Sequence, residues 1–285
     1  MISKKDIDIA FNYYKIDFKY KKRCYKCAKK VNENKYYTSK LKKLFNKLNY
    51  DDFKNISPLW DIKDINKLFG FDIDPFLTNL VIILSYKNHK KNMKKTSFDL
   101  NQIKIHKKRV RECFTNDLEK RNYEGVRISQ MLWAIYFIRT RIVEIGRLQY
   151  EYYSKNIIKI YIPGGFRLDY DAVIKSLIES KSILEKMYCM TDIKYICNSW
   201  LLSNQINKII PATSNIYKFY SLFDVKDGKT CVSDILNFLY GLKECDNYKN
   251  LQESTSLQKN IKYRLINNEV FLLGEGTLKN SVFYV

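Results

Sequence analysis

The sequence predicts a mixed α/β (α+β) fold in which a helical N-terminal domain packs on a domain with a mixed β-sheet. Three observations favour it. Apolar residues recur at helical spacing up to about Tyr123, alternating strand patterns interleave with helices after Gly125, and no Pro/Gly/Ser-rich linker separates the halves. The 285 residues suffice for one large or two modest domains. We expect domains 1–127 and 128–285, packed as one body.

The first half is expected to be helical throughout. Residues 39–53 place four apolar side chains on one helix face: Leu41, Leu44, Phe45 and Leu48. Two further helices each begin with a capping side chain followed by proline, at Ser57-Pro58 and at Asp74-Pro75. Residues 97–122 complete this half as one or two more helices.

The second half alternates helices with strands. A long helix is expected from residue 128 to Gly146 because apolar residues line one side of it. The expected elements that follow are strands at 147–153 and 156–163, a helix at 169–188, a strand at 193–202, a helix at 203–210, a strand at 214–229, helices at 231–242 and 254–268, and a closing strand at 270–278.

Composition restricts the class of protein. The longest apolar run, Leu80 to Tyr86, is too short to cross a membrane, and the polar start lacks a secretory signal, so we expect a cytoplasmic protein. Seven cysteines spread widely do not indicate a disulfide framework. Cys24 and Cys27 form a C-x-x-C pair, but zinc normally takes four ligands and no second pair is present. We expect no metal site.

The net charge of +21 points toward nucleic acid or an anionic surface. Lysine outnumbers arginine, however, and arginine is the side chain that favours base-edge and phosphate contacts. Solvated helix faces therefore explain the charge more simply than a nucleic-acid surface does. Binding of RNA or DNA through the basic N-terminal half stays open as an alternative.

The segment YIPGGFRLDYD, from Tyr161 to Asp171, is a candidate ligand site. A strand ends at Pro163, two glycines allow close backbone approach, and a helix then presents its free amides. Such a junction can hold a phosphate or diphosphate. The alternative is a plain turn in which Asp169 caps the helix and the acidic side chains repel an anion.

Two further segments carry polar groups next to aromatic rings. At the end of the strand 193–202, Asn198 and Trp200 share one face, and Ser199 lies on the other. These side chains either line a substrate site or satisfy local backbone groups. In the first strand, Glu151 beside Tyr150 suits a general base for an amine, although an ion pair with a lysine is the simpler explanation. Neither histidine lies in this half to activate Cys197 or Ser199 as a nucleophile.

Five strings in order, IVEIGRLQYE, IYIPGGFRLDYDAVIKSL, CNSWLLS, SNIYKF and TSLQKNI, resemble a bacterial family of GNAT-like acyltransferases. Its members join a helical N-acyltransferase N-terminal domain to a GNAT-like C-terminal domain. The resemblance runs from about Arg139 to the end and is architectural before that point. It implies a mixed sheet that binds acetyl-CoA or another acyl-CoA and transfers the acyl group to an amine.

By this resemblance, five residues would line the cofactor loop: Ile162, Pro163, Gly164, Gly165 and Leu168. Asn198 would polarise the thioester carbonyl, and Glu151 or Tyr161 would accept a proton; Ser199 and Trp200 would contact substrate. The family pattern has histidines where this chain has Tyr161 and Asn198. A catalytically inert GNAT-like regulatory binder is therefore a further alternative to the acyltransferase.

Overall fold

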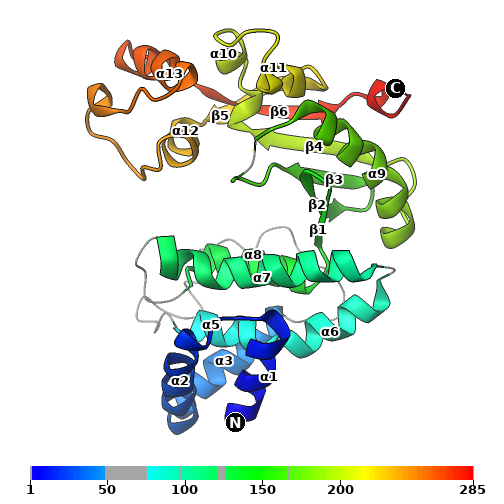
Figure 1. Ribbon diagram of the computed structural model, residues 1–285, viewed down its shortest axis with the longest axis vertical. Coiled ribbons are helices and arrows are strands. Elements are labelled where there is room, and N and C mark those ends of the chain that lie inside the picture. The colour runs from blue at the N-terminus through cyan, green and yellow to red at the C-terminus, as the bar shows by residue number, and fades with distance from the viewer. Residues whose placement is uncertain (1, 49–75, 97, 121–125, 166, 285) are drawn as a thin grey trace. The chain divides into compact units, whose positions relative to one another are not determined.

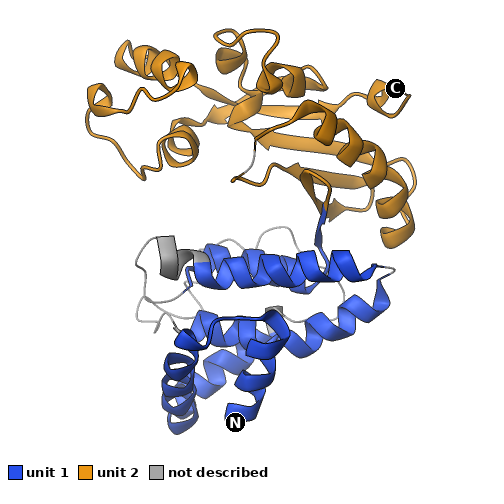
Figure 2. Ribbon diagram, viewed as in Figure 1, with its two compact units in different colours: residues 1–144 blue, residues 145–285 orange. Residues whose placement is uncertain are grey.

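The computed structural model describes residues 2–48, 76–96, 98–120, 126–165 and 167–284. The helix expected from Ser57-Pro58 lies outside these residues. The chain divides into two compact units, residues 1–144 and residues 145–285 (Figure 2). In the described part of the chain, no helix is long and apolar enough to cross a membrane.

The first unit is built from helices, which Figure 1 shows in blue to green. Its described helices are α1 (Lys4–Tyr14), the 3₁₀ helix η1 (Phe18–Tyr20), α2 (Lys21–Glu33), α3 (Lys35–Leu48), α5 (Phe76–Leu84), α6 (Tyr86–Lys95), α7 (Leu100–Lys120) and α8 (Ile128–Ile138). Local sequence explains their ends: Ser3, for example, caps α1 by accepting a hydrogen bond from the amide of Asp6 at 3.1 Å. The predicted helical half is confirmed.

The core of this unit is apolar, and two of the predicted features lie in it. Leu41 of α3 is buried, as the helical spacing predicted. Cys24 and Cys27 lie on the buried side of α2, and burial raises the pKa of the Cys24 thiol to about 12. No group of three or more His, Cys, Asp or Glu side chains that could hold a metal ion occurs among the described residues.

The chain turns sharply after α8, earlier than predicted. The helix ends at Ile138, and Thr140 adopts a left-handed backbone conformation with φ +57°. The β-branched segment Ile142–Ile145 then forms strand β1 instead of continuing the helix to Gly146, so that prediction is wrong. Because α8 packs on α5 and α7, it belongs with the first unit, whereas the sequence suggested a boundary before it, after residue 127.

A six-stranded mixed sheet forms the centre of the second unit, and its edge strand β1 begins within the last residues of the first unit. Its strands are β1, β2 (Leu148–Ser154), β3 (Ile157–Tyr161), β4 (Lys194–Ser199), β5 (Phe223–Thr230) and β6 (Leu272–Leu278). Their order across the sheet is β1-β2-β3-β4-β6-β5. Strands β3 and β4 are parallel, whereas β2 pairs with β3, and β6 with both β4 and β5, in antiparallel fashion. The predicted mixed sheet is confirmed.

Helix α9 (Tyr170–Tyr188) connects the two parallel strands and covers one face of the sheet (Figure 1). The hydroxyl of Tyr150 in β2 lies 2.8 Å from the hydroxyl of Ser176 in α9. The ring of Tyr152 packs on Tyr188 at the other end of the helix, with ring centroids 5.1 Å apart. Side chains of β2, β3 and β4 therefore alternate between this face and the opposite face, which is named the open face here because Asn198 is exposed on it.

The remaining elements of the second unit flank the sheet. They are η3 (Trp200–Leu202), α10 (Asn204–Asn207), α11 (Asn215–Tyr220), α12 (Val232–Leu239), η4 (Tyr248–Asn250), α13 (Ser256–Ile266) and η5 (Asn280–Tyr284). Helix α11 replaces the first part of the strand predicted at 214–229, because Ser214 caps it by accepting from the amide of Tyr217 at 3.1 Å. Strand β5 begins only at Phe223.

Two glycines of β6 allow η3 to cross the sheet closely. A Cβ atom on Gly274 would lie 2.1 Å from the backbone oxygen of Leu202, and one on Gly276 would lie 2.8 Å from the Leu202 side chain. Only glycine fits such an approach without moving the neighbour. The end of β4 is thereby held against β6.

Candidate active site

The pairing of the two parallel strands stops before either strand ends. Strand β3 matches β4 only from Ile157↔Lys194 to Lys159↔Ile196. Beyond that point, Ile160 and Tyr161 pair only with β2, and residues 197–199 pair only with β6. Both strands lie wholly within the described residues, so the centre of the sheet parts at the C-terminal ends of β3 and β4.

The predicted loop with two glycines follows directly on β3. Gly164 and Gly165 are exposed, a Cβ on either would meet no atom within 4 Å, and Gly165 has φ +91°. Asp169 caps α9, as predicted, by accepting from the amide of Ala172 at 2.9 Å. Among the described residues, the amides of Tyr170 and Asp171 donate to no other group. The helix start therefore keeps two free donors and the positive end of its dipole.

An arginine that the sequence did not single out holds this loop. Arg147 lies in the turn between β1 and β2, and its Nη1 donates to the Pro163 carbonyl at 3.0 Å. Its Nε donates to the Arg167 carbonyl at 3.1 Å. One guanidinium thus joins both flanks of the two glycines. The partners lie 16 and 20 residues away in sequence, so no local pattern could have revealed the contact.

Glu151 and Tyr161, both predicted site residues, lie in contact on the open face. The Tyr161 hydroxyl donates to Glu151 Oε2 at 2.6 Å, and Glu151 is only 3% exposed. Lys159, also missed from sequence, lies directly opposite Glu151 in the ladder, and its ammonium group is 5.3 Å from the centre of the Tyr161 ring. A buried carboxylate, a phenol and a cation therefore meet at the place where β3 leaves β4.

The predicted residues of β4 have separate surroundings. Asn198 is exposed and lies two residues beyond Ile196, hence on the same open face as Glu151 and Tyr161. Ser199 accepts from the amide of Leu201 at 3.2 Å, which caps η3. Trp200 belongs to η3 and packs against an apolar cluster that includes Ile206. The alternation that would place Trp200 beside Asn198 ends with the strand. The structure therefore puts Asn198 on the same face as the Glu151–Tyr161 pair, whereas Ser199 and Trp200 have local partners.

Cys197 is not a nucleophile. It is 1% exposed and lies on the face opposite Asn198. Burial raises the pKa of its thiol to about 12, against an opposing effect of Lys159. At neutral pH the group is a thiol.

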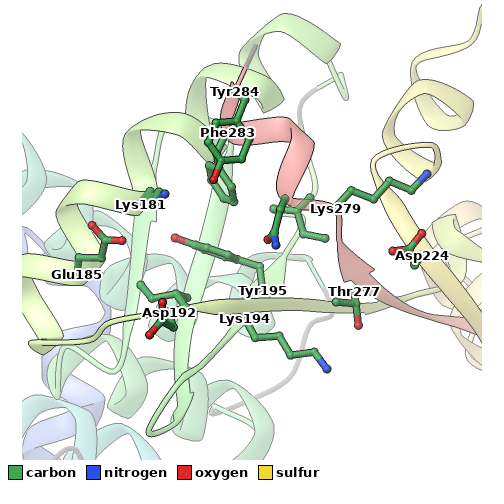
Figure 3. A pocket seen from close by; sticks show the side chains of 13 residues that line it. Lys181, Glu185, Asp192, Lys194, Tyr195, Asp224, Thr277, Lys279, Phe283 and Tyr284 are labelled. Atoms are coloured by element: carbon green, nitrogen blue, oxygen red, sulfur yellow. The ribbon is translucent and has the colours of Figure 1, made fainter.

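Two hollows lie along α9. An open groove of about 670 Å³ begins at its first turn, where Tyr170, Ile174 and Ile178 face Leu222 and Val282. A second hollow, of about 520 Å³, lies where β4 begins, and Figure 3 shows lysines and carboxylates around the ring of Tyr195. This second hollow does not include Glu151, Tyr161 or Asn198, whereas the groove adjoins the two-glycine junction.

The family described as the GNAT-like C-terminal domain matches residues 142–278. The domain contains the parted strands, the two-glycine loop and the Glu151–Tyr161 pair. No curated protein matches the chain in sequence.

Solved structures share the fold beyond the GNAT-like domain. A mutant acyltransferase in complex with octanoyl-CoA aligns with a TM-score of 0.73 at 13% identity, over 98% of this chain and 88% of that chain. An acyltransferase in complex with decanoyl-CoA aligns with a TM-score of 0.66 at 16% identity, over 84% of this chain and 77% of that chain. An acyltransferase in complex with CoA and 10C-teicoplanin aligns with a TM-score of 0.62 at 16% identity, over 71% of this chain and 66% of that chain. The joining of helices to a GNAT-like sheet, predicted from sequence, is confirmed.

Proposed function

We propose that this protein transfers an acyl group from an acyl-coenzyme A thioester to an amine. The observation that carries the proposal is the parting of β3 and β4 beside a two-glycine loop and a helix start, in a GNAT-like domain. The similar structures bind CoA, octanoyl-CoA or decanoyl-CoA, which supports a thioester donor. The acceptor is proposed only as an amine.

Each part of the donor has a matching part of this junction. The diphosphate would lie against the free amides of Tyr170 and Asp171 and the backbone of Gly164 and Gly165. Ile162, Pro163 and Leu168 would complete that loop. The pantetheine arm carries two amides, and the unpaired edges of β3 and β4 offer backbone donors and acceptors for them. This arrangement would direct the thioester toward the open face.

On that face the amine nitrogen would attack the thioester carbonyl carbon. A C–N bond forms, the C–S bond breaks, and coenzyme A leaves as a thiolate that takes up a proton. The amine loses a proton to Glu151, either directly or through the hydroxyl of Tyr161 that already donates to it. The amide of Asn198 would donate to the carbonyl oxygen as negative charge develops on it. Ser199 and Trp200 would act by holding Asn198 in place at the strand end, since their own side chains contact protein.

Calorimetric titration with acetyl-CoA and octanoyl-CoA tests donor binding. Gly165→Ala should weaken binding strongly, because the side chain would enter the proposed diphosphate position. Gly241→Ala is the matched control: both glycines have positive φ (+91° and +71°), and a Cβ on either would meet nothing within 4 Å. The backbone strain is therefore similar, about 1–2 kcal/mol. Absence of binding by the unaltered protein, or equal effects of the two variants, would contradict the proposal.

Turnover separates an enzyme from a binder that has lost catalysis. Release of the coenzyme A thiol in the presence of a panel of primary amines should require both the donor and an amine. Donor binding without thiol release for any amine would favour the inert regulatory alternative, because Tyr161 and Asn198 stand where histidines were expected. Formation of the acylated amine, identified by mass spectrometry, would establish the transfer.

A further inference from the structure

Arg147 is the one side chain that bonds both flanks of the two-glycine loop, among the contacts that the structure describes. Its Nη1 reaches the Pro163 carbonyl and its Nε reaches the Arg167 carbonyl, with Gly164 and Gly165 between them. A planar guanidinium presents its donors in a fixed fork, so it fixes the separation of two carbonyls in a way that an ammonium group does not. Arg147 thereby fixes the distance between the two ends of the loop.

The turn between β1 and β2 that carries Arg147 is itself hydrogen-bonded to α9. Ser176 of α9 donates from its hydroxyl to the Ile145 carbonyl and accepts from the Leu148 amide at 3.3 Å, so it holds both sides of the turn that carries Arg147. A Cβ on Gly146 would lie 3.1 Å from the Ser176 Cβ, which shows how closely the turn packs there. The β1–β2 turn is therefore hydrogen-bonded to α9 through Ser176 and to the loop before α9 through Arg147.

Charge gives Arg147 a second effect at the same place. The first turn of α9 carries Asp169 and Asp171, two negative charges that oppose an anionic ligand. Arg167 and Arg147 add two positive charges to the same segment, Arg167 by its place in the sequence and Arg147 through its bond to the Arg167 carbonyl.

We infer that Arg147 is a positioning residue for the donor diphosphate: it holds the loop in its binding conformation and offsets the negative charge of the helix start. The inference rests on the proposed function. It assigns to Arg147 an effect on affinity for the diphosphate end of the donor and not on affinity for its thioester end.

Binding of two probes to the full chain tests it. Acetyl-CoA contains the diphosphate, whereas S-acetylpantetheine lacks it. Arg147→Ala should raise the Kd for acetyl-CoA by about tenfold or more, the equivalent of one hydrogen-bonded charge, and leave the Kd for S-acetylpantetheine within about twofold. Arg147→Lys keeps the charge but cannot bridge both carbonyls. Its Kd for acetyl-CoA should therefore lie between those of the unaltered protein and of Arg147→Ala. Arg264→Ala, which removes a cation of α13 that pairs with Glu269, is the matched control and should leave both constants unchanged.

Hydrogen exchange gives a readout that does not depend on the ligand. In Arg147→Ala the amide of Asp169, which donates to the same Arg167 carbonyl at 3.0 Å, should exchange faster, while the amides of β2 keep their protection. Unchanged exchange of the Asp169 amide, or an equal loss of affinity for both probes, would overturn the inference. Failure of the unaltered protein to bind acetyl-CoA would instead refute the proposed function, and the two failures are thus distinct.

Discussion

At the scale of single residues, the Glu151–Tyr161 contact is the most informative feature of the site. The register of β2 against β3 places Glu151 opposite Lys159 and leaves Tyr161 free to reach back to the carboxylate. The sequence supported Glu151 and Tyr161 as candidates, since alternation in a hairpin puts residues of odd number on one face. It could not supply Arg147, whose partners are set by where the chain returns in space.

Replacing Glu151 with glutamine tests the proposed base. Glutamine keeps the shape and the acceptor for Tyr161 but takes no proton, so kcat should fall by about 100-fold or more, with little change in donor KM. Steady-state kinetics with a saturating amine measure both constants. Glu179→Gln, an exposed carboxylate of α9, is the control. A rate for Glu151→Gln close to that of the unaltered protein would assign the base elsewhere.

Asp169 gives a second test at this scale, because its cap and its charge act in opposite directions on the proposed ligand. Asn caps a helix as well as Asp does. Asp169→Asn should therefore preserve the bond to the Ala172 amide while removing a charge near the diphosphate, and affinity for acetyl-CoA should increase by about two- to fivefold. Titration calorimetry checks this, with Asp192→Asn, in the hollow of Figure 3, as the control. Weaker binding by Asp169→Asn would mean that no anion lies there.

At the scale of elements, most helices and strands of the second unit follow from sequence patterns, and the exceptions have physical causes. Apolar spacing continued from α8 into Ile142, which concealed the left-handed turn at Thr140 that separates α8 from β1. The aromatic and β-branched residues of α11 favoured a strand, but the Ser214 cap and packing against α9 stabilise a helix. Such tertiary effects have no signature within a short window of sequence. The parting of β3 and β4 likewise depends on partners on both sides of the pair.

The crossing of η3 over β6 predicts an unusually sensitive glycine. Gly274→Ala places a methyl group 2.1 Å from a backbone oxygen, so the free energy of unfolding should fall by about 2 kcal/mol or more. Gly164→Ala is the matched control for stability, because neither glycine has positive φ and a Cβ on Gly164 meets open space. Urea unfolding compares the free energies of unfolding of the two variants, provided that the dependence of this free energy on urea concentration is the same in both. Equal stabilities would show that η3 can move away from the sheet at little cost.

At the scale of the whole molecule, the imidazole groups that titrate in weak acid are confined to one of the two units. The chain has two histidines, His89 and His106, and both lie in the first unit. Each is 0% exposed, with ring centroids 6.2 Å apart, and the nearby groups include Tyr13, Tyr14 and Lys107. Burial lowers the pKa of His106 to about 4, against an opposing effect of the Phe137 backbone, and lowers that of His89 well below its usual value.

Stability should therefore fall as the pH falls through the region below 6.5. In the unfolded chain these histidines protonate near pH 6.5, whereas the folded unit resists protonation, so their contribution is complete above that pH and is lost progressively below it. For His106 the loss continues to about pH 4 and reaches about 2 kcal/mol by pH 5. In His106→Gln, the change in the free energy of unfolding between pH 7 and pH 5 should be about half of that in the unaltered protein. Calorimetry at the two pH values measures it. An unchanged pH-dependence would show that the ring protonates while buried.

The same two rings also report on motion. Diethyl pyrocarbonate acylates an imidazole nitrogen only where the reagent can reach it, and both rings are fully shielded in the folded helices. Residues 145–285 contain no histidine at all. Each modified ring would therefore record a transient separation of the N-terminal helices and not a motion of the sheet. The rate of histidine acylation would measure how often that separation occurs.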